Sequence, residues 1–233
     1  MEIYLVRHGV TDWNSQFKIQ GDTDIPLNEL GIQMAMQTAK ALEDKGIVFD
    51  KVYSSPLDRA KKTAEILAKS TSIVTDERLK EMCFGQMEGA CIKEMNGTNP
   101  FFEYFRKDCL TYDEEAAKSD DIETFSSVVK RASDFMKNVI ESDVLAKEEK
   151  ECRTAKGRDL RILISGHGAL DQAILFYVKR TDSIAKFWKS GLLGNCSIAV
   201  IDYNPETGEY TMKEENMVLF DESLQKMVPK LLQ

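Results

Sequence analysis

Short apolar runs alternate with amphipathic helical stretches along most of this chain, and the alternation limits the fold more than any other feature. Four runs are rich in β-forming residues, at 2–6, 51–53, 73–75 and 160–165. Helical spacing of apolar residues follows three of them, at 28–45, 57–67 and 169–179. Strands that alternate with helices predict an α/β protein, a three-layer sandwich in which helices flank a mostly parallel central sheet. The segments 198–203 and 210–219 flank a turn-rich connection and predict a terminal hairpin.

Local signals predict where two of the helices begin and end. Asn28 is suited to cap the first helix, and Gly46 follows its end as a C′ residue. Ser55 and Pro56 predict an N-cap and a first-turn proline for the second helix.

Residues 92–157 interrupt the alternation. This stretch is net acidic, and a helix is predicted from about residue 124 to residue 138. It contains an aromatic cluster formed by Phe101, Phe102, Tyr104, Phe105 and Tyr112. We interpret 92–157 as a helical insertion or cap over the sheet, within a single domain spanning 1–233, because this length favours one domain.

Composition excludes several classes of function. Hydrophobic residues make up 42% of the chain, yet the longest apolar run, 173–178, is far shorter than the roughly 20 residues that cross a bilayer. The net charge of −8 disfavours non-specific binding to nucleic acid or to an anionic membrane. We therefore expect neither nucleic acid nor membrane as a partner.

The five cysteines are scattered and form no CxxC pair, which predicts neither a disulfide framework nor a zinc cluster. No basic segment precedes the first apolar run, so no secretory signal is visible. We expect a reducing, cytoplasmic location.

The chain contains only two histidines, and their surroundings are alike. His8 and His167 each follow an apolar strand and precede a glycine. This places both imidazoles at the carboxyl edge of the sheet, where open α/β proteins bind ligands. A lone histidine there is more often structural, but a matched pair favours function.

The neighbours of His8 favour an anion over a metal. A metal site needs further ligands at recognisable spacing, and neither HxH nor HExxH occurs. Arg7 places a fixed positive charge beside His8, and its planar guanidinium can bind two phosphate oxygens at once. We predict no metal and no cofactor.

Five sequence blocks, in order, are similar to those of the histidine phosphatase superfamily, the phosphoglycerate mutase-like proteins. They are residues 7–14 (RHGVTDWN), 20–27 (QGDTDIPL), 53–60 (YSSPLDRA), 79–89 (LKEMCFGQMEG) and 165–168 (SGHG). One such block is weak evidence, whereas five in order are specific; the insertion is the part without firm motifs.

The resemblance implies a role for each matched residue. It makes His8 the nucleophile that forms a phosphohistidine, with a backbone carbonyl near Gly9 orienting the ring. It makes Glu81 the proton donor and acceptor, whereas Glu88 has a structural role. The remaining matches, which would bind phosphate, are Arg7, Asn14, Gln20, Gly21, Arg59 and His167, the last also stabilising the transition state.

Three functions remain open at this stage. The favoured one is metal-independent hydrolysis of a small-molecule phosphomonoester, of the histidine acid phosphatase type, because residues 21–24 and 81–85 resemble the phosphatase branch. The alternatives are a cofactor-dependent phosphoglycerate mutase and a non-catalytic phosphate-binding regulator. Gln172 stands where family members often have arginine, so the resemblance names no substrate. The protein is expected to be a monomer or homodimer.

Overall fold

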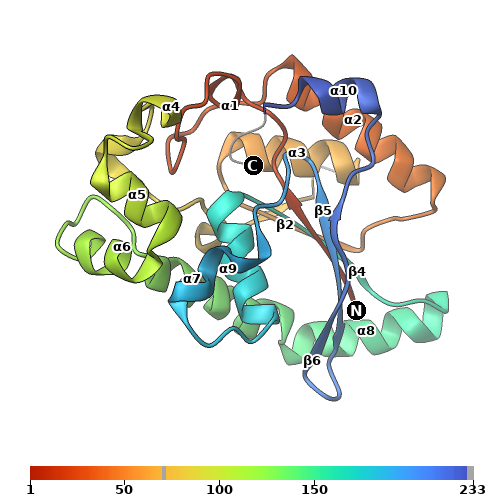
Figure 1. Cartoon of the computed structure of the whole chain (residues 1–233). Coiled ribbons are helices and arrows are strands. Elements are labelled where there is room, and N and C mark those ends of the chain that lie inside the picture. The colour runs from red at the N-terminus through yellow and green to blue at the C-terminus, as the bar shows by residue number, and fades with distance from the viewer. Residues whose placement is uncertain (70–71, 230–233) are drawn as a thin grey trace.

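The computed structural model describes residues 1–69 and 72–229 and contains one six-stranded sheet (Figure 1). The strand order is β3-β2-β4-β1-β5-β6. The strands are β1 (Glu2–Arg7), β2 (Lys51–Ser54), β3 (Val74–Thr75), β4 (Arg161–Gly166), β5 (Ile198–Asn204) and β6 (Glu209–Met217). The first four are mutually parallel, and β5 pairs antiparallel with both β1 and β6. The predicted α/β fold and terminal hairpin are confirmed.

Each side of the sheet has its own hydrophobic core. Along β1, Ile3 and Leu5 pack into one core and Tyr4 and Val6 into the other, because successive strand residues point to opposite faces. Burial of β1 and β4 on both faces explains why their sequences are continuously apolar.

Helices cover both faces. The helices α2 (Glu29–Asp44), α3 (Asp58–Ala68) and α10 (Glu222–Met227) pack on one side, and α9 (Gly168–Val178) packs on the other (Figure 1). Asn28 caps α2 through a hydrogen bond from the backbone of Gly31, as predicted. The predicted cap of α3 is wrong: the N-cap is Leu57, and the hydroxyl of Ser55 instead accepts from the backbone of Leu57 in the turn before the helix.

The insertion is helical and lies on the α9 side of the sheet (Figure 1). Its elements are α4 (Ile92–Met95), α5 (Pro100–Lys107), α6 (Cys109–Ala116), α7 (Phe125–Phe135), a π-helical turn η3 (Met136–Ile140) and α8 (Asp143–Lys156). Its buried residues join the core that contains Ile3 and Leu5. That the whole chain is one domain stays a prediction.

Short elements complete the carboxyl edge of the sheet: α1 (Asp12–Ser15) and the 3₁₀ turns η1 (Glu77–Leu79), η2 (Gly85–Met87) and η4 (Ile184–Ser190). Among the described residues, no helix is long and apolar enough to cross a membrane.

Candidate active site

The carboxyl ends of three neighbouring strands bring the predicted residues together. In the parallel pair β1 and β4, Arg7 lies opposite Gly166, and the N–H of His8 donates to the carbonyl of Gly166 at 3.1 Å. The two histidine–glycine turns are therefore side by side. The third strand, β2, ends at Ser54, shortly before the first turn of α3, which contains Arg59.

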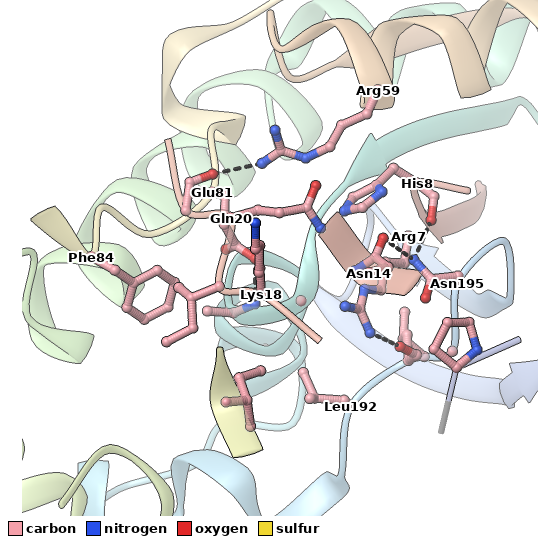
Figure 2. Close-up of a pocket in the computed structure, with 18 of the residues that line it drawn as sticks. Arg7, His8, Asn14, Lys18, Gln20, Arg59, Glu81, Phe84, Leu192 and Asn195 are labelled. Carbon is pink, nitrogen blue, oxygen red and sulfur yellow. Dashed lines mark hydrogen bonds between the residues drawn. The ribbon is translucent and has the colours of Figure 1, made fainter. Parts of the chain in front are cut away.

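A cavity of about 420 Å³ opens at this edge (Figure 2). The sequence-predicted residues that line it are Arg7, His8, Asn14, Gln20, Gly21, Arg59 and Glu81. His167 does not line the cavity. It is fully buried, and its ring centroid lies 5.2 Å from that of His8.

The surroundings of His8 fix its tautomer. Its Nδ1 lies 2.7 Å from the carbonyl oxygen of Gly9, in the place expected for an orienting carbonyl. A carbonyl only accepts hydrogen bonds, so Nδ1 bears the proton and Nε2 keeps its lone pair. Burial, together with Arg59 and Arg7, holds the pKa of His8 well below its usual value. The imidazole is therefore neutral, as a nucleophile must be.

His167 is held by its backbone. It caps α9, and its N–H donates to Oδ1 of Asp171 at 3.1 Å. Both ring nitrogens are buried and have no hydrogen-bond partner among the described residues. Burial, with Arg59 and His8 nearby, lowers the pKa of His167 well below its usual value. Unpaired buried polar atoms are costly and are often found where a ligand binds.

These lowered pKa values predict that acid destabilises the protein. Between the folded pKa and the ordinary value near 6.5, the unfolded chain binds protons that the folded chain excludes. The stability contributed by His8 and His167 is complete above about pH 6.5, and it is lost as pH falls towards the folded pKa, by up to about 1.4 kcal/mol per pH unit for each ring. Asp171, whose pKa is raised by burial and by Glu81, has the opposite dependence. The contribution of one histidine is therefore measured by comparing how the unfolding free energy of a variant and of the wild-type protein depends on pH.

We expect the variant His167→Asn to lose unfolding free energy less steeply than the wild-type protein as pH is lowered from about 7 to about 5. Urea denaturation at several pH values measures both slopes. Equal slopes would mean that His167 titrates alike in the folded and unfolded chains.

The two arginines are oriented by backbone carbonyls. Arg7 donates from Nη1 to Leu193 O at 2.8 Å. Arg59, which is fully buried, donates to Thr23 O at 2.7 Å and to Gly21 O at 2.6 Å. The Nε atoms of both arginines are buried and have no partner among the described residues. Two fixed guanidinium groups with unused donors suit the oxygens of a phosphoryl group.

Thr11 orients the two amide side chains. The Oδ1 of Asn14 accepts from the N–H of Thr11 at 3.1 Å, and the Oε1 of Gln20 accepts from the Thr11 hydroxyl at 2.9 Å. Since the amide oxygens are engaged with these donors, the NH₂ groups remain to donate in the cavity.

Gly21 and Glu88 form a structural unit beside Arg59. Gly21 has a φ of +57°, and a Cβ there would lie 2.1 Å from Oε1 of Glu88. The Glu88 carboxylate accepts from the N–H groups of Asp22 at 3.0 Å, Thr23 at 2.9 Å and Phe84 at 3.0 Å. Glu88 therefore holds this loop in place, in agreement with the structural role assigned to it.

Glu81 reaches the cavity from the segment after η1, and the first turn of α9 holds its carboxylate. Oε1 accepts from the N–H of Leu170 at 3.1 Å and from its neighbour Met82 at 2.8 Å, and Oε2 accepts from Ala169 at 3.2 Å. A carboxylate at a helix N-terminus is favoured by the helix dipole. Gly168, the first residue of α9, lies against this carboxylate, since a Cβ there would be in ordinary van der Waals contact with Oε2 of Glu81 at 3.4 Å.

Asn195 is a residue of the site that was not predicted from the sequence. Its Nδ2 donates to the carbonyl of His8 at 3.1 Å, so it supports the turn that contains His8. Asn195 lies just before β5, and β5 is antiparallel to β1, so its N-terminal end meets the carboxyl end of β1. A polar residue before this strand was the available signal.

The apolar wall of the cavity was also missed. The residues that form it are Ile19, Phe84, Ile92, Phe102, Phe105, Trp188, Leu192, Leu193 and Val228. Two of them, Phe102 and Phe105, belong to the aromatic cluster noted in the sequence. Gln172, the departure from the family pattern, lies outside the lining and donates from Nε2 to Phe187 O at 2.8 Å.

Among the described residues, no group of three or more His, Cys, Asp or Glu side chains could hold a metal ion. The residues that line the cavity supply a neutral imidazole, two guanidinium groups, amide donors and a carboxyl group.

Comparisons with known proteins place this geometry in context. The chain is 40% identical over 98 residues to a probable phosphoglycerate mutase, GpmB, of Proteus mirabilis, a match that covers 41% of this chain and 45% of the relative. A probable phosphoglycerate mutase GpmB of Escherichia coli is 43% identical over 90 residues, a match that covers 38% of this chain and 41% of the relative. The matches thus span less than half the length of these curated relatives.

Solved structures match over far more of the chain. YhfR of Bacillus stearothermophilus has a TM-score of 0.71 and 28% identity, covering 93% of this chain and 97% of its own. A variant phosphoserine phosphatase from Entamoeba histolytica, solved with phosphoserine, has a TM-score of 0.68 and 26% identity, covering 91% and 95%. The family model described as histidine phosphatase superfamily (branch 1) matches residues 3–216. With its two histidine turns and two oriented arginines at the carboxyl edge of the sheet, this chain belongs to the histidine phosphatase superfamily.

Proposed function

We propose that this protein is a phosphomonoesterase of the histidine acid phosphatase type, which hydrolyses a small-molecule phosphoester through a phosphohistidine on His8. The observation that carries the proposal is the bond between Nδ1 of His8 and Gly9 O, which leaves Nε2 as a nucleophile in a cavity also lined by Arg7 and Arg59. Phosphoryl transfer depends chiefly on such positioning and on charge stabilisation.

In the first proposed step, the lone pair of Nε2 forms a bond to phosphorus while the bond to the leaving oxygen breaks. In its protonated form, Glu81 gives its carboxyl proton to that oxygen, so an alcohol departs. In the second step, water attacks the phosphohistidine and loses a proton to Glu81. The P–N bond breaks, which releases inorganic phosphate and restores neutral His8.

The arginines would stabilise the charge on the equatorial oxygens, with His167 beside His8 as a further donor. The NH₂ groups of Asn14 and Gln20, and the backbone of Gly21, would complete the phosphate site. Arg7 and Arg59 supply the fixed positive charge that this transfer needs, so we propose that it proceeds without a metal ion.

The apolar wall favours a phosphatase with an uncharged or apolar leaving group over a mutase. A bisphosphoglycerate requires positive charge for a second phosphate and a carboxylate. Beyond Arg7 and Arg59, Lys18 is the one further Lys or Arg among the described lining residues, and the insertion contributes Ile92, Phe102 and Phe105. The mutase remains the second candidate, because the curated relatives are named probable phosphoglycerate mutases.

The test is phosphate release from a panel of esters in the presence of a chelator, with His8→Ala as the control. The panel contains aryl and alkyl phosphates, phosphoserine and 3-phosphoglycerate. We expect chelator-resistant release that is fastest with apolar leaving groups and absent in the variant. Faster isomerisation of phosphoglycerate, in an assay primed with bisphosphoglycerate, would establish the mutase instead. Phosphate binding without turnover in either assay would establish a regulator.

We further propose that the protein acts in the cytoplasm, as a monomer or homodimer, with a small phosphoester as its only required partner. The five cysteines are free, which suits a reducing compartment.

A further inference from the structure

Arg131, on α7 of the insertion, has all five of its side-chain N–H groups engaged. From Nη1 it donates to Arg78 O at 2.8 Å and to Lys80 O at 2.6 Å. From Nη2 it donates to Glu81 O at 3.1 Å. The remaining donors bind Glu123: Nε donates to Oε1 at 2.8 Å, and Nη2 to Oε2 at 3.0 Å. A guanidinium group has five N–H donors, so none of those of Arg131 is left over.

The three carbonyls belong to the short segment that carries the proposed acid. Arg78 lies in η1, and Lys80 and Glu81 follow it directly. The ends of helical turns leave carbonyls without partners, and a cation there is favourable. Arg131 therefore fixes the direction of the backbone on both sides of Lys80, including the peptide carbonyl of Glu81 itself.

Glu123 also binds this segment, at its C-terminal end. Its backbone N–H donates to Cys83 O at 2.9 Å. Arg131 and Glu123 are a bidentate ion pair with about four-fifths of each side chain shielded from solvent, a geometry that gives such pairs their specificity. The insertion thus binds the segment 78–83 at four backbone carbonyls.

We propose that Arg131, supported by Glu123, is a positioning residue that sets the place of the Glu81 carboxyl group relative to the leaving oxygen of the substrate. This inference rests on the proposed function, in which Glu81 protonates the leaving group. The backbone of Glu81 is held by Arg131 and its carboxylate by the first turn of α9, so the side chain is fixed at both ends.

Hydrophobic packing holds the segment independently of Arg131. Leu79 and Met82, on either side of Lys80 and Glu81, are fully buried in the core. Removal of the guanidinium group therefore leaves the segment attached to the protein but frees the orientation of its peptide groups. A displacement of about 1 Å at a catalytic group can cost about 10²-fold in rate.

Leaving groups distinguish this role from a general structural one. An alkoxide is a poor leaving group and needs the proton from Glu81, whereas 4-nitrophenolate departs without it. A misplaced acid slows the alkyl ester alone, while a distorted phosphate site slows both esters equally.

The experiment compares kcat/KM for 4-nitrophenyl phosphate and 2-phenylethyl phosphate in three variants, R131M, R131K and E123Q. We expect R131M to lose about 10²-fold with the alkyl ester and less than about 3-fold with the nitrophenyl ester. The rates of R131K and E123Q with the alkyl ester should lie between those of R131M and the wild-type protein, because each variant keeps some of the hydrogen bonds. Arg153→Met is the matched control, since Arg153 pairs with Glu149 and Asp159 on α8 and beyond it; it should change neither rate.

Equal losses with both esters in the soluble variants, or no loss, would overturn the inference. E81Q shows which proposal has failed. If E81Q loses activity with the alkyl ester alone, but R131M, R131K and E123Q do not, the positioning role is wrong. If E81Q loses activity equally with both esters, or not at all, the acid role of Glu81 is wrong.

Discussion

Replacement of His8 by asparagine is expected to abolish turnover of every phosphoester, by about 10⁴-fold or more, and to prevent covalent phosphate labelling. Asparagine can still donate a hydrogen bond to Gly9 O, but it has no ring nitrogen with a lone pair for attack. The variant therefore removes the nucleophile and keeps the local hydrogen bond. The measurement is quenched-flow incubation with a ³²P-labelled ester, followed by a test for acid-labile, base-stable label.

The chain itself supplies the control, because His167 is the only other histidine. The variant His167→Asn should still form the labelled intermediate, though more slowly, since we propose that this ring stabilises charge and does not attack. If the label persisted in His8→Asn and vanished in His167→Asn, His167 would be the nucleophile and His8 would not.

The variant Arg59→Lys is expected to lower kcat/KM by about 10³-fold, within the range known for arginines that stabilise phosphoryl transfer. Lysine keeps the charge but lacks the planar fork, so it cannot hold Gly21 O and Thr23 O together and still present a donor to phosphate. Because this contact strengthens as charge develops on the equatorial oxygens, the loss should fall mainly on kcat.

Steady-state kinetics and thermal unfolding of the same preparation separate this effect from loss of the fold. The control Arg153→Lys makes the same exchange in an ion pair of α8 and should be active. An Arg59→Lys protein with ordinary kcat would mean that Arg59 holds the loop 21–23 and does not touch the phosphate.

The sequence was sufficient to predict the fold class and seven of the residues that line the cavity. Strand-ending residues such as His8 are fixed by short-range pattern, since an apolar run followed by glycine ends at the edge of the sheet. Arg59 is placed by its position in the first turn of a helix. Such local signals specify where the chain turns, and the parallel sheet brings the turns together.

Contacts between distant segments could not be predicted in this way. Arg131 is half-buried at the border between the buried and the exposed faces of α7, and its carbonyl partners are 50 or more residues away. Every residue has a backbone carbonyl, so this contact cannot be predicted from residue types. The side chains that form the apolar wall come from separate segments, and their meeting depends on how the insertion packs on the sheet.

The position of β1 has a consequence for how the chain is made. Glu2 pairs with Arg161 on one side and with Asp202 on the other, so β1 is translated more than 150 residues before either of its partners. Until then, β1 has two unpaired apolar edges of the kind that invite aggregation. His8, at the end of β1, is thus translated well before the strands that complete its site, and contacts of such long sequence separation favour slow folding.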